Sequence, residues 1–194
     1  VFLGLYLAMD PGLYIRGTLA LVPHAEREAA REALSAAGAA LRRWLVGQLV
    51  AMCAVGAFTF AGLWALDIPY AMSLAFVAFV LEFVPFIGPI LAAVPALLIA
   101  FTIGPSTALA VALLYLVIQQ VEGNVVMPLV QRWAVSLPPA LGVIAVVVFG
   151  LLFGIPGVLF ATPLMVVAVV LVRKLYVERA LGDPKVRVLP GAPE

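Results

Sequence analysis

The sequence predicts an all-α, polytopic membrane protein with two broken-helix or re-entrant hairpins and one cytoplasmic amphipathic helix. Three observations lead to this prediction. Hydrophobic residues make up 65% of the 194 residues and charged residues 11%, whereas a soluble domain has about 25% charged residues. The mean hydropathy is +1.21. Several apolar runs also reach the roughly 20 residues that a helix needs to cross a bilayer.

The charges are concentrated in two segments, residues 10–43 and 173–194, which flank an apolar region. Both segments are rich in Arg or Lys, and the positive-inside rule therefore places both on the cytoplasmic side of a bacterial inner membrane. An even number of crossings must then separate them. The net charge of +1 gives no reason to expect nucleic-acid binding.

The chain divides into four predicted parts. Residues 1–9 resemble the end of a transmembrane helix that is too short to cross alone, so we expect the chain to be a piece of a longer protein. Residues 10–43 form the cytoplasmic amphipathic segment, residues 44–175 the transmembrane transport domain, and residues 176–194 a flexible cytoplasmic tail.

Small and apolar residues recur in the amphipathic segment at intervals of three and four, which predicts a helix with a narrow packing seam. We expect this helix to lie on the membrane surface or against a neighbouring subunit. It should continue past Arg42 and Arg43 into a span over residues 44–66. The seam residues are Ala30, Leu34, Ala37, Leu41 and Trp44.

The first interruption lies within residues 70–101, a run too long for one span and too short for two. Two prolines and a glycine in its middle should break the helix, because proline removes a backbone hydrogen bond and clashes with the preceding turn. We predict a hairpin with arms at about residues 70–83 and 90–102. Two short tilted helices joined by an ordinary interface loop are the alternative. The residues at the tip are Glu82, Pro85, Gly88 and Pro89.

The second interruption lies within residues 116–133, where polar side chains occur in an otherwise apolar run. An unpaired carboxylate in hydrocarbon costs several kcal/mol, so we expect these side chains to form a polar site enclosed by protein. A re-entrant hairpin or broken helix at Gly123 and Pro128 would build it. A surface turn at the membrane–water boundary is the alternative. The polar residues are Gln119, Gln120, Glu122 and Asn124.

A third set of turn residues separates the last two apolar runs, residues 137–153 and 155–172. Glycine and proline are typical of tight turns, so Gly154, Pro156 and Gly157 are expected to turn the chain between these runs.

Paired interrupted helices are typical of the substrate sites of secondary transporters, because their ends expose unpaired backbone N–H and C=O groups. We therefore assign Glu82 and Glu122 as ionisable groups of a substrate or ion pathway. The amides of Gln119, Gln120 and Asn124 would orient a small polar solute. Because burial disfavours the charged form of a carboxyl group, a proton or sodium is the expected coupling ion, and no other cofactor is expected.

The sequence contains no catalytic or metal-binding constellation. With one histidine, His24, and one cysteine, Cys53, neither a zinc motif nor a disulfide scaffold can form. The three aspartates all lie in predicted loops, which argues against an intramembrane aspartate pair. We therefore expect no enzymatic activity. A passive scaffold is the remaining alternative to transport, and it would tolerate leucine at both glutamates of the interruptions.

Three stretches are similar to one known family. They are V-P-F-I-G-P at residues 84–89, Q-Q-V-E-G-N with M-P-L-V at residues 119–130, and G-I-P-G with A-T-P-L at residues 154–164. They resemble the autoinducer-2 exporter family of bacterial membrane proteins, also called permease M-like, and the resemblance extends from about residue 3 to residue 175. It implies export of the small polar signal autoinducer-2, an elevator-like movement of the hairpin region and a homo-pentamer. Other members are sodium(lithium)/proton antiporters, which makes that activity the alternative.

Overall fold

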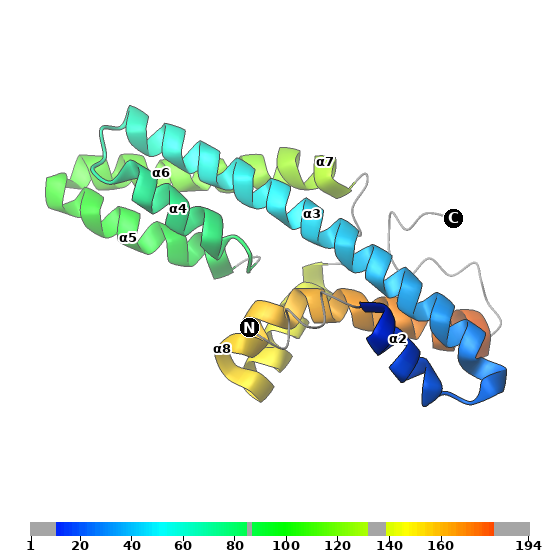
Figure 1. Ribbon diagram of the computed structural model, residues 1–194. Helices are drawn as coiled ribbons and strands as arrows, with labels where there is room; N and C mark the ends of the chain where they lie inside the picture. The colour runs from blue at the N-terminus through cyan, green and yellow to red at the C-terminus, as the bar shows by residue number, and fades with distance from the viewer. Residues whose placement is uncertain (1–10, 85–86, 132–138, 181–194) are drawn as a thin grey trace.

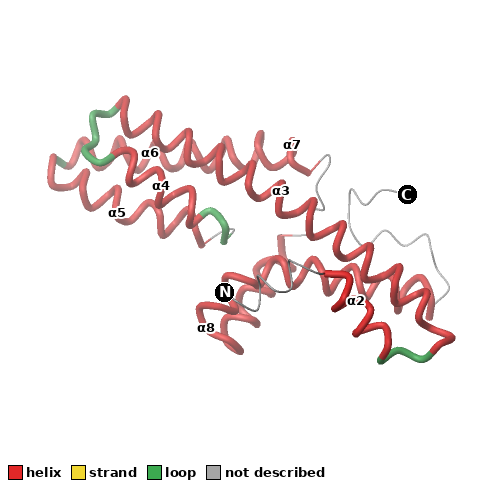
Figure 2. The backbone as a smooth tube through the Cα atoms, in the orientation of Figure 1, coloured by secondary structure: helices red, strands yellow, loops and turns green. Residues whose placement is uncertain are grey.

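The computed structural model describes residues 11–84, 87–131 and 139–180, and each element in these ranges is a helix (Figures 1 and 2). The prediction of an all-α fold is therefore confirmed. The elements are α2 (Pro11–Ala20), η1 (His24–Glu26), α3 (Arg27–Ala65), α4 (Ala71–Leu81), α5 (Ile87–Ile103), α6 (Pro105–Val121), η2 (Glu122–Val126), α7 (Met127–Gln131), α8 (Pro139–Val172) and η3 (Arg173–Ala180). The predicted span end at residues 1–9 and the side chain of Arg132 lie outside the described residues.

Helix α3 is the central element of the structure, and helices on both sides pack against it (Figure 1). It contains 39 residues and is therefore about 58 Å long at 1.5 Å per residue. The predicted continuation past Arg42 and Arg43 is confirmed. Its buried face repeats at intervals of three and four, as in the predicted seam, but with a partly different set of residues. Those buried in its first half are Ala33, Ala37, Ala40 and Trp44.

Two groups of helices pack against opposite ends of α3 (Figure 1). The second half of α3 packs with α4, α5 and α6 around a cluster that includes Leu63, Leu74, Ala96 and Val111. The first half packs against the end of α8, where Trp44 contacts Val166 and Val170 in a second cluster. The rings of Trp44 and Phe83 meet edge to face at 6.0 Å between centroids. This contact brings the end of α4 next to the middle of α3.

Helices α4 and α5 form the predicted hairpin, with its turn between Leu81 and Ile87. Helix α5 begins three residues earlier than expected, so Pro89 lies in its first turn, where the missing N–H costs little. Gly88 is needed at this turn because a Cβ there would overlap the carbonyl oxygen of Leu81. Pro85 lies outside the described residues.

The second interruption requires a correction. The chain does not reverse at Gly123, and a helix continues from α6 through η2 and α7 as far as Gln131. The winding changes instead, because η2 is a π-helix of 5 residues. A π-helical turn is wider than an α-helical turn and interrupts the regular hydrogen-bond ladder, which accommodates Pro128 directly after it without ending the helix.

Helix α8 bends back on itself at Gly154, the position where the sequence predicts a turn. Gly154 has φ 64° and ψ −144°, a conformation that only glycine adopts readily. A Cβ on Gly157 would overlap the carbonyl oxygen of Phe149, eight residues earlier. In a straight helix these residues would be about 12 Å apart, so the chain reverses between them.

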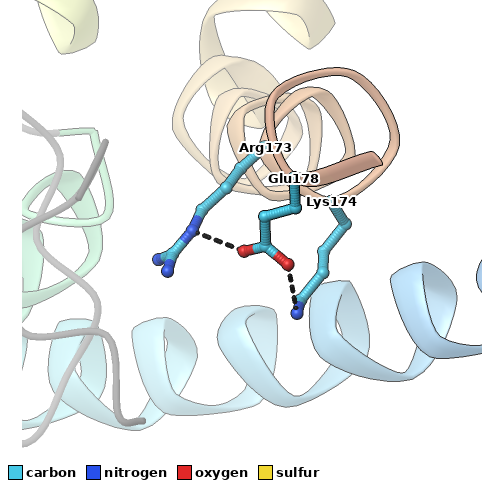
Figure 3. Close-up of polar contacts among 3 residues, drawn as sticks. All are labelled: Arg173, Lys174 and Glu178. Atoms are coloured by element: carbon cyan, nitrogen blue, oxygen red, sulfur yellow. Dashed lines mark hydrogen bonds and ion pairs between the residues drawn. The ribbon is translucent and has the colours of Figure 1, made fainter. Parts of the chain in front are cut away.

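Three helices are long and apolar enough to cross a membrane: Arg27–Ala65, Pro105–Val130 and Ala140–Glu178. Helices α4 and α5 are apolar but shorter. The last span continues into η3, where Glu178 accepts hydrogen bonds from Arg173 at 2.9 Å and Lys174 at 2.7 Å (Figure 3). Residues 176–180, predicted to belong to a flexible tail, are therefore helical.

We expect Gly88→Ala to destabilise the protein by about 1–3 kcal/mol, the usual cost of forcing extra atoms into a packed site. The added Cβ would overlap the Leu81 carbonyl oxygen and force the hairpin apart. Gly123→Ala is the matched control, because nothing lies within 4 Å of the Cβ that it would add. Size-exclusion chromatography after heating in detergent measures the fraction that stays folded. Equal losses in both variants would contradict the close approach.

Candidate functional site

The structure brings together two glutamates that are 40 positions apart in the sequence. Glu82 is the residue that ends α4, and Glu122 is the first residue of η2. Their side chains are buried, with 1% of Glu82 and 7% of Glu122 exposed. The two carboxyl groups lie close enough to act on each other electrostatically. We call them the carboxyl pair.

The carboxyl pair has few hydrogen-bond donors around it. Among the described residues, neither oxygen of Glu82 meets an N–H or O–H donor. One oxygen of Glu122, Oε2, accepts a hydrogen bond from Nε2 of Gln119 at 2.9 Å. Two unit charges about 4 Å apart repel by about 4 kcal/mol at an effective dielectric constant of about 20. A proton or another cation is therefore needed to keep the two carboxyl groups close together.

Gln48 of α3 positions the end of α4 that carries Glu82. Its side chain is 5% exposed, and its Nε2 donates a hydrogen bond of 2.6 Å to the backbone carbonyl oxygen of Glu82. The last carbonyl groups of a helix have no partner within the helix, so this amide satisfies an otherwise unpaired acceptor. Gln48, a lone amide within an apolar span, was not among the predicted site residues. Its spacing from the buried Ala51 and Val55 of the same helix was the available signal.

A cavity of about 780 Å³ adjoins the carboxyl pair. Helices α3, α4, α5 and α6 and the start of η2 form its walls, which are mainly aliphatic. Its polar groups come from Tyr115, Gln119 and Glu122. Its size lies within the range of roughly 300–1,000 Å³ for sites that bind small molecules. Glu122 therefore connects the carboxyl pair to the cavity, whereas Glu82 lies behind it.

Gln120 and Asn124 do not join the carboxyl pair. Both side chains are exposed, and Nδ2 of Asn124 donates to the backbone carbonyl oxygen of Gln120 at 2.8 Å. A separate hollow of about 310 Å³ lies beside Gln120. Because successive helical residues are 100° apart, Gln119 and Glu122 share one face of the helix while Gln120 and Asn124 share another. The uninterrupted helix thus separates polar residues that a hairpin would have gathered.

The glycine and proline residues predicted to interrupt helices lie partly at the cavity and partly away from it. Pro89 lines the cavity, and Gly88 lies at the adjacent hairpin turn. Gly154, Pro156 and Gly157 belong to α8, which contacts only α3 and η3 among the described elements. The bend of α8 is therefore remote from the carboxyl pair. Within the described ranges, no group of three or more His, Cys, Asp or Glu residues could hold a metal ion.

Comparison with known proteins gives a consistent set of relatives. A family model described as AI-2E family transporter matches residues 1–176. "Putative transport protein YrrI" of Bacillus subtilis is 30% identical over 162 residues, which is 84% of this chain and 46% of the relative. A Thermotoga maritima protein with the same designation is 32% identical over 125 residues, 64% of this chain and 39% of its own length.

A further relative, from Escherichia coli K12, has a more specific name. "AI-2 transport protein TqsA" is 32% identical over 136 residues, 69% of this chain and 38% of the relative. The chain thus spans less than half the length of each of these three relatives.

We expect Gln48→Leu to destabilise the protein by about 1–3 kcal/mol, because it leaves the buried carbonyl oxygen of Glu82 without a donor. Gln120→Leu is the matched control, because it makes the same chemical change at an exposed side chain. Thermal denaturation of the two variants in the same detergent measures the difference. A loss of stability no greater for Gln48→Leu than for Gln120→Leu would contradict the positioning role of Gln48.

Proposed function

Because the chain belongs to the AI-2E family of transporters, we propose that it forms the solute and ion site of a secondary transporter for a small polar metabolite. The single observation that carries this proposal is the buried carboxyl pair beside a cavity of about 780 Å³. The name of the E. coli relative makes autoinducer-2 the candidate solute. Export is the proposed direction.

The chemistry of the cavity fits such a solute. Its walls are mainly aliphatic, and a few convergent polar groups are what fixes a small ligand in a site of this kind. The carboxyl group of Glu122 and the amide of Gln119 lie side by side at its wall, so hydroxyl groups of a solute would have both acceptors and a donor within reach. Buried carboxyl groups in membrane helices are expensive to place, which argues against a passive scaffold.

We also propose an elevator-like mechanism, in which the α4–α5 hairpin and α6 move together relative to α8. Its support is the pattern of contacts. Helix α5 contacts α4 and α6, and α4 and α6 each contact α3, whereas α8 contacts α3 and η3 but none of the helices of this group. The moving group would then have to release only a small contact at this end, where Phe83 packs on the cluster that Trp44 forms with Val166 and Val170.

The distribution of charge supports a proposed location for the protein, and its apolar surface supports a proposed assembly. Residues 10–43 and 173–194 carry the basic residues, which supports a cytoplasmic position for both in a bacterial inner membrane. The bend of α8 exposes large apolar side chains, including Leu151 at 84% and Ile155 at 79%. A surface of this kind suits lipid and the homo-pentamer that the family resemblance implies.

We expect Glu122→Gln to reduce autoinducer-2 efflux by about tenfold or more, equivalent to about 1.4 kcal/mol, because it removes the ionisable group at the cavity wall. Efflux into inverted membrane vesicles is the measurement, repeated over a series of pH values. Glu32→Gln on the exposed face of α3 is the matched control. Unchanged efflux with an unchanged pH profile would remove Glu122 from the mechanism.

A sodium(lithium)/proton antiporter is the second candidate, favoured by the two oxygens of Glu82 that meet no donor. Such oxygens are the ligands that hard cations prefer. This activity predicts that sodium or lithium dissipates a preformed pH gradient in vesicles, that Glu82→Gln abolishes the response and that Glu32→Gln keeps it. Fluorescence dequenching of a pH-sensitive dye measures it. The absence of any cation response would eliminate the antiporter and leave the solute exporter.

A further inference from the structure

The carboxyl group of Glu82 occupies an unusual position, since it is buried and meets no hydrogen-bond donor among the described residues. An ionised carboxylate there would be both desolvated and unpartnered, which is the most costly arrangement for a buried polar group. A protonated carboxyl group instead has one O–H to donate. The nearby titratable group that acts on Glu82 is the carboxyl group of Glu122.

The surroundings of Glu122 assign the proton to one side of the pair. Oε2 of Glu122 already accepts a hydrogen bond from the Gln119 amide, which favours the ionised form of Glu122. Neither oxygen of Glu82 accepts such a bond among the described residues, so Glu82 is the better place for the proton. One proton, donated from Glu82 to Glu122, satisfies both groups and removes the repulsion between two negative charges.

Among the described residues, no other charged group acts on the carboxyl pair. Helix α3 presents the neutral amide of Gln48 to this region, and α6 presents the neutral Gln119. Helix α5 presents Gly88 and Pro89 beyond the turn. Glu82 and Glu122 are therefore the titratable groups that act on each other here, and the charge of the pair depends on one proton.

We propose that this single shared proton is a latch that ties the end of the α4–α5 hairpin to α6, and that its loss releases the hairpin. The hairpin end has two ties, each made by Glu82. Its backbone carbonyl oxygen is held to α3 by the amide of Gln48 at 2.6 Å, which does not depend on pH. Its side chain is held to η2, at the end of α6, by the proton.

The proton step is a simple transfer. The O–H bond of Glu82 breaks, the electron pair stays on the Glu82 carboxylate, and the proton passes to Glu122. Glu122 lines the cavity and passes the proton to water there. The two carboxylates that remain repel each other across the contact, and the hairpin end moves away from α6. This inference rests on the proposed transport function, because it assigns the ion that controls the same site.

Infrared difference spectroscopy of the protein in lipid vesicles tests the latch without measuring transport. We expect a carbonyl stretching signal from one neutral carboxylic acid, which disappears as the pH rises. Glu82→Gln should abolish the signal, Glu122→Gln should shift its frequency because the acceptor changes, and Glu32→Gln should leave it intact. Absence of the signal at every pH, or its persistence in Glu82→Gln, overturns the proposal.

Hydrogen exchange of the backbone amides in residues 78–90 provides the second readout. We expect exchange to accelerate in the wild-type protein over the pH range in which the infrared signal is lost, beyond the ordinary chemical rise. In Glu82→Gln this extra acceleration should be absent. If sodium slows exchange while no carboxylic acid signal is present, a bound metal cation replaces the proton and the latch proposal is overturned.

These outcomes are distinguishable from failure of the transport function. A proton signal together with pH-dependent hairpin opening, but without solute efflux, supports the latch and overturns the proposed transport. Efflux without the signal overturns the latch alone. Should Glu82→Gln fail to fold, Gln119→Leu serves instead, because removing the amide donor from Glu122 must shift the pH at which the signal disappears. An unchanged titration in a folded Gln119→Leu variant counts against the assignment.

Discussion

The cost of placing two carboxyl groups among apolar helices constrains much of this structure. A carboxylate in a dry interior is tolerated only when neighbouring groups or ions compensate its charge. Glu82 and Glu122 approach each other because α4 and η2 both pack against α3, and the amides of Gln48 and Gln119 donate hydrogen bonds to these two glutamates. Alanines at the contacts, such as Ala78 and Ala92, allow the helices to come close enough.

Much of the fold follows from the sequence because few physical rules decide it. An apolar run of sufficient length must be helical in a membrane, since every backbone group needs a partner. The P-F-I-G-P run stops a helix because proline cannot continue the hydrogen-bond ladder and Gly88 permits the arms to touch. The length of α3 was foreseeable because Arg42 and Arg43 carry high helix propensity and do not interrupt the periodicity.

The candidate site was only partly predictable, because the sequence did not determine which of its polar side chains share one face of the helix. Glu82 and Glu122 are recognisable in the sequence as carboxyl groups within apolar segments, and the structure brings them together. Whether Gln120 and Asn124 join them depends on whether the helix breaks at Gly123, and the sequence contains turn residues that fit either outcome. The π-helix η2 packs against α3, a contact between segments far apart in the sequence that local propensity does not reveal.

The continuity of α3 has a mechanical consequence. One unbroken rod of 39 residues carries the hairpin group near one end and the bent α8 near the other. Its backbone hydrogen bonds continue without interruption from end to end, so the helix can rock as one unit. A small tilt about its middle, where Trp44 and Gln48 meet the end of α4, would swing the two ends in opposite senses. Such a lever would convert a local displacement near Trp44 and Gln48 into larger, opposed movements at the two ends of α3.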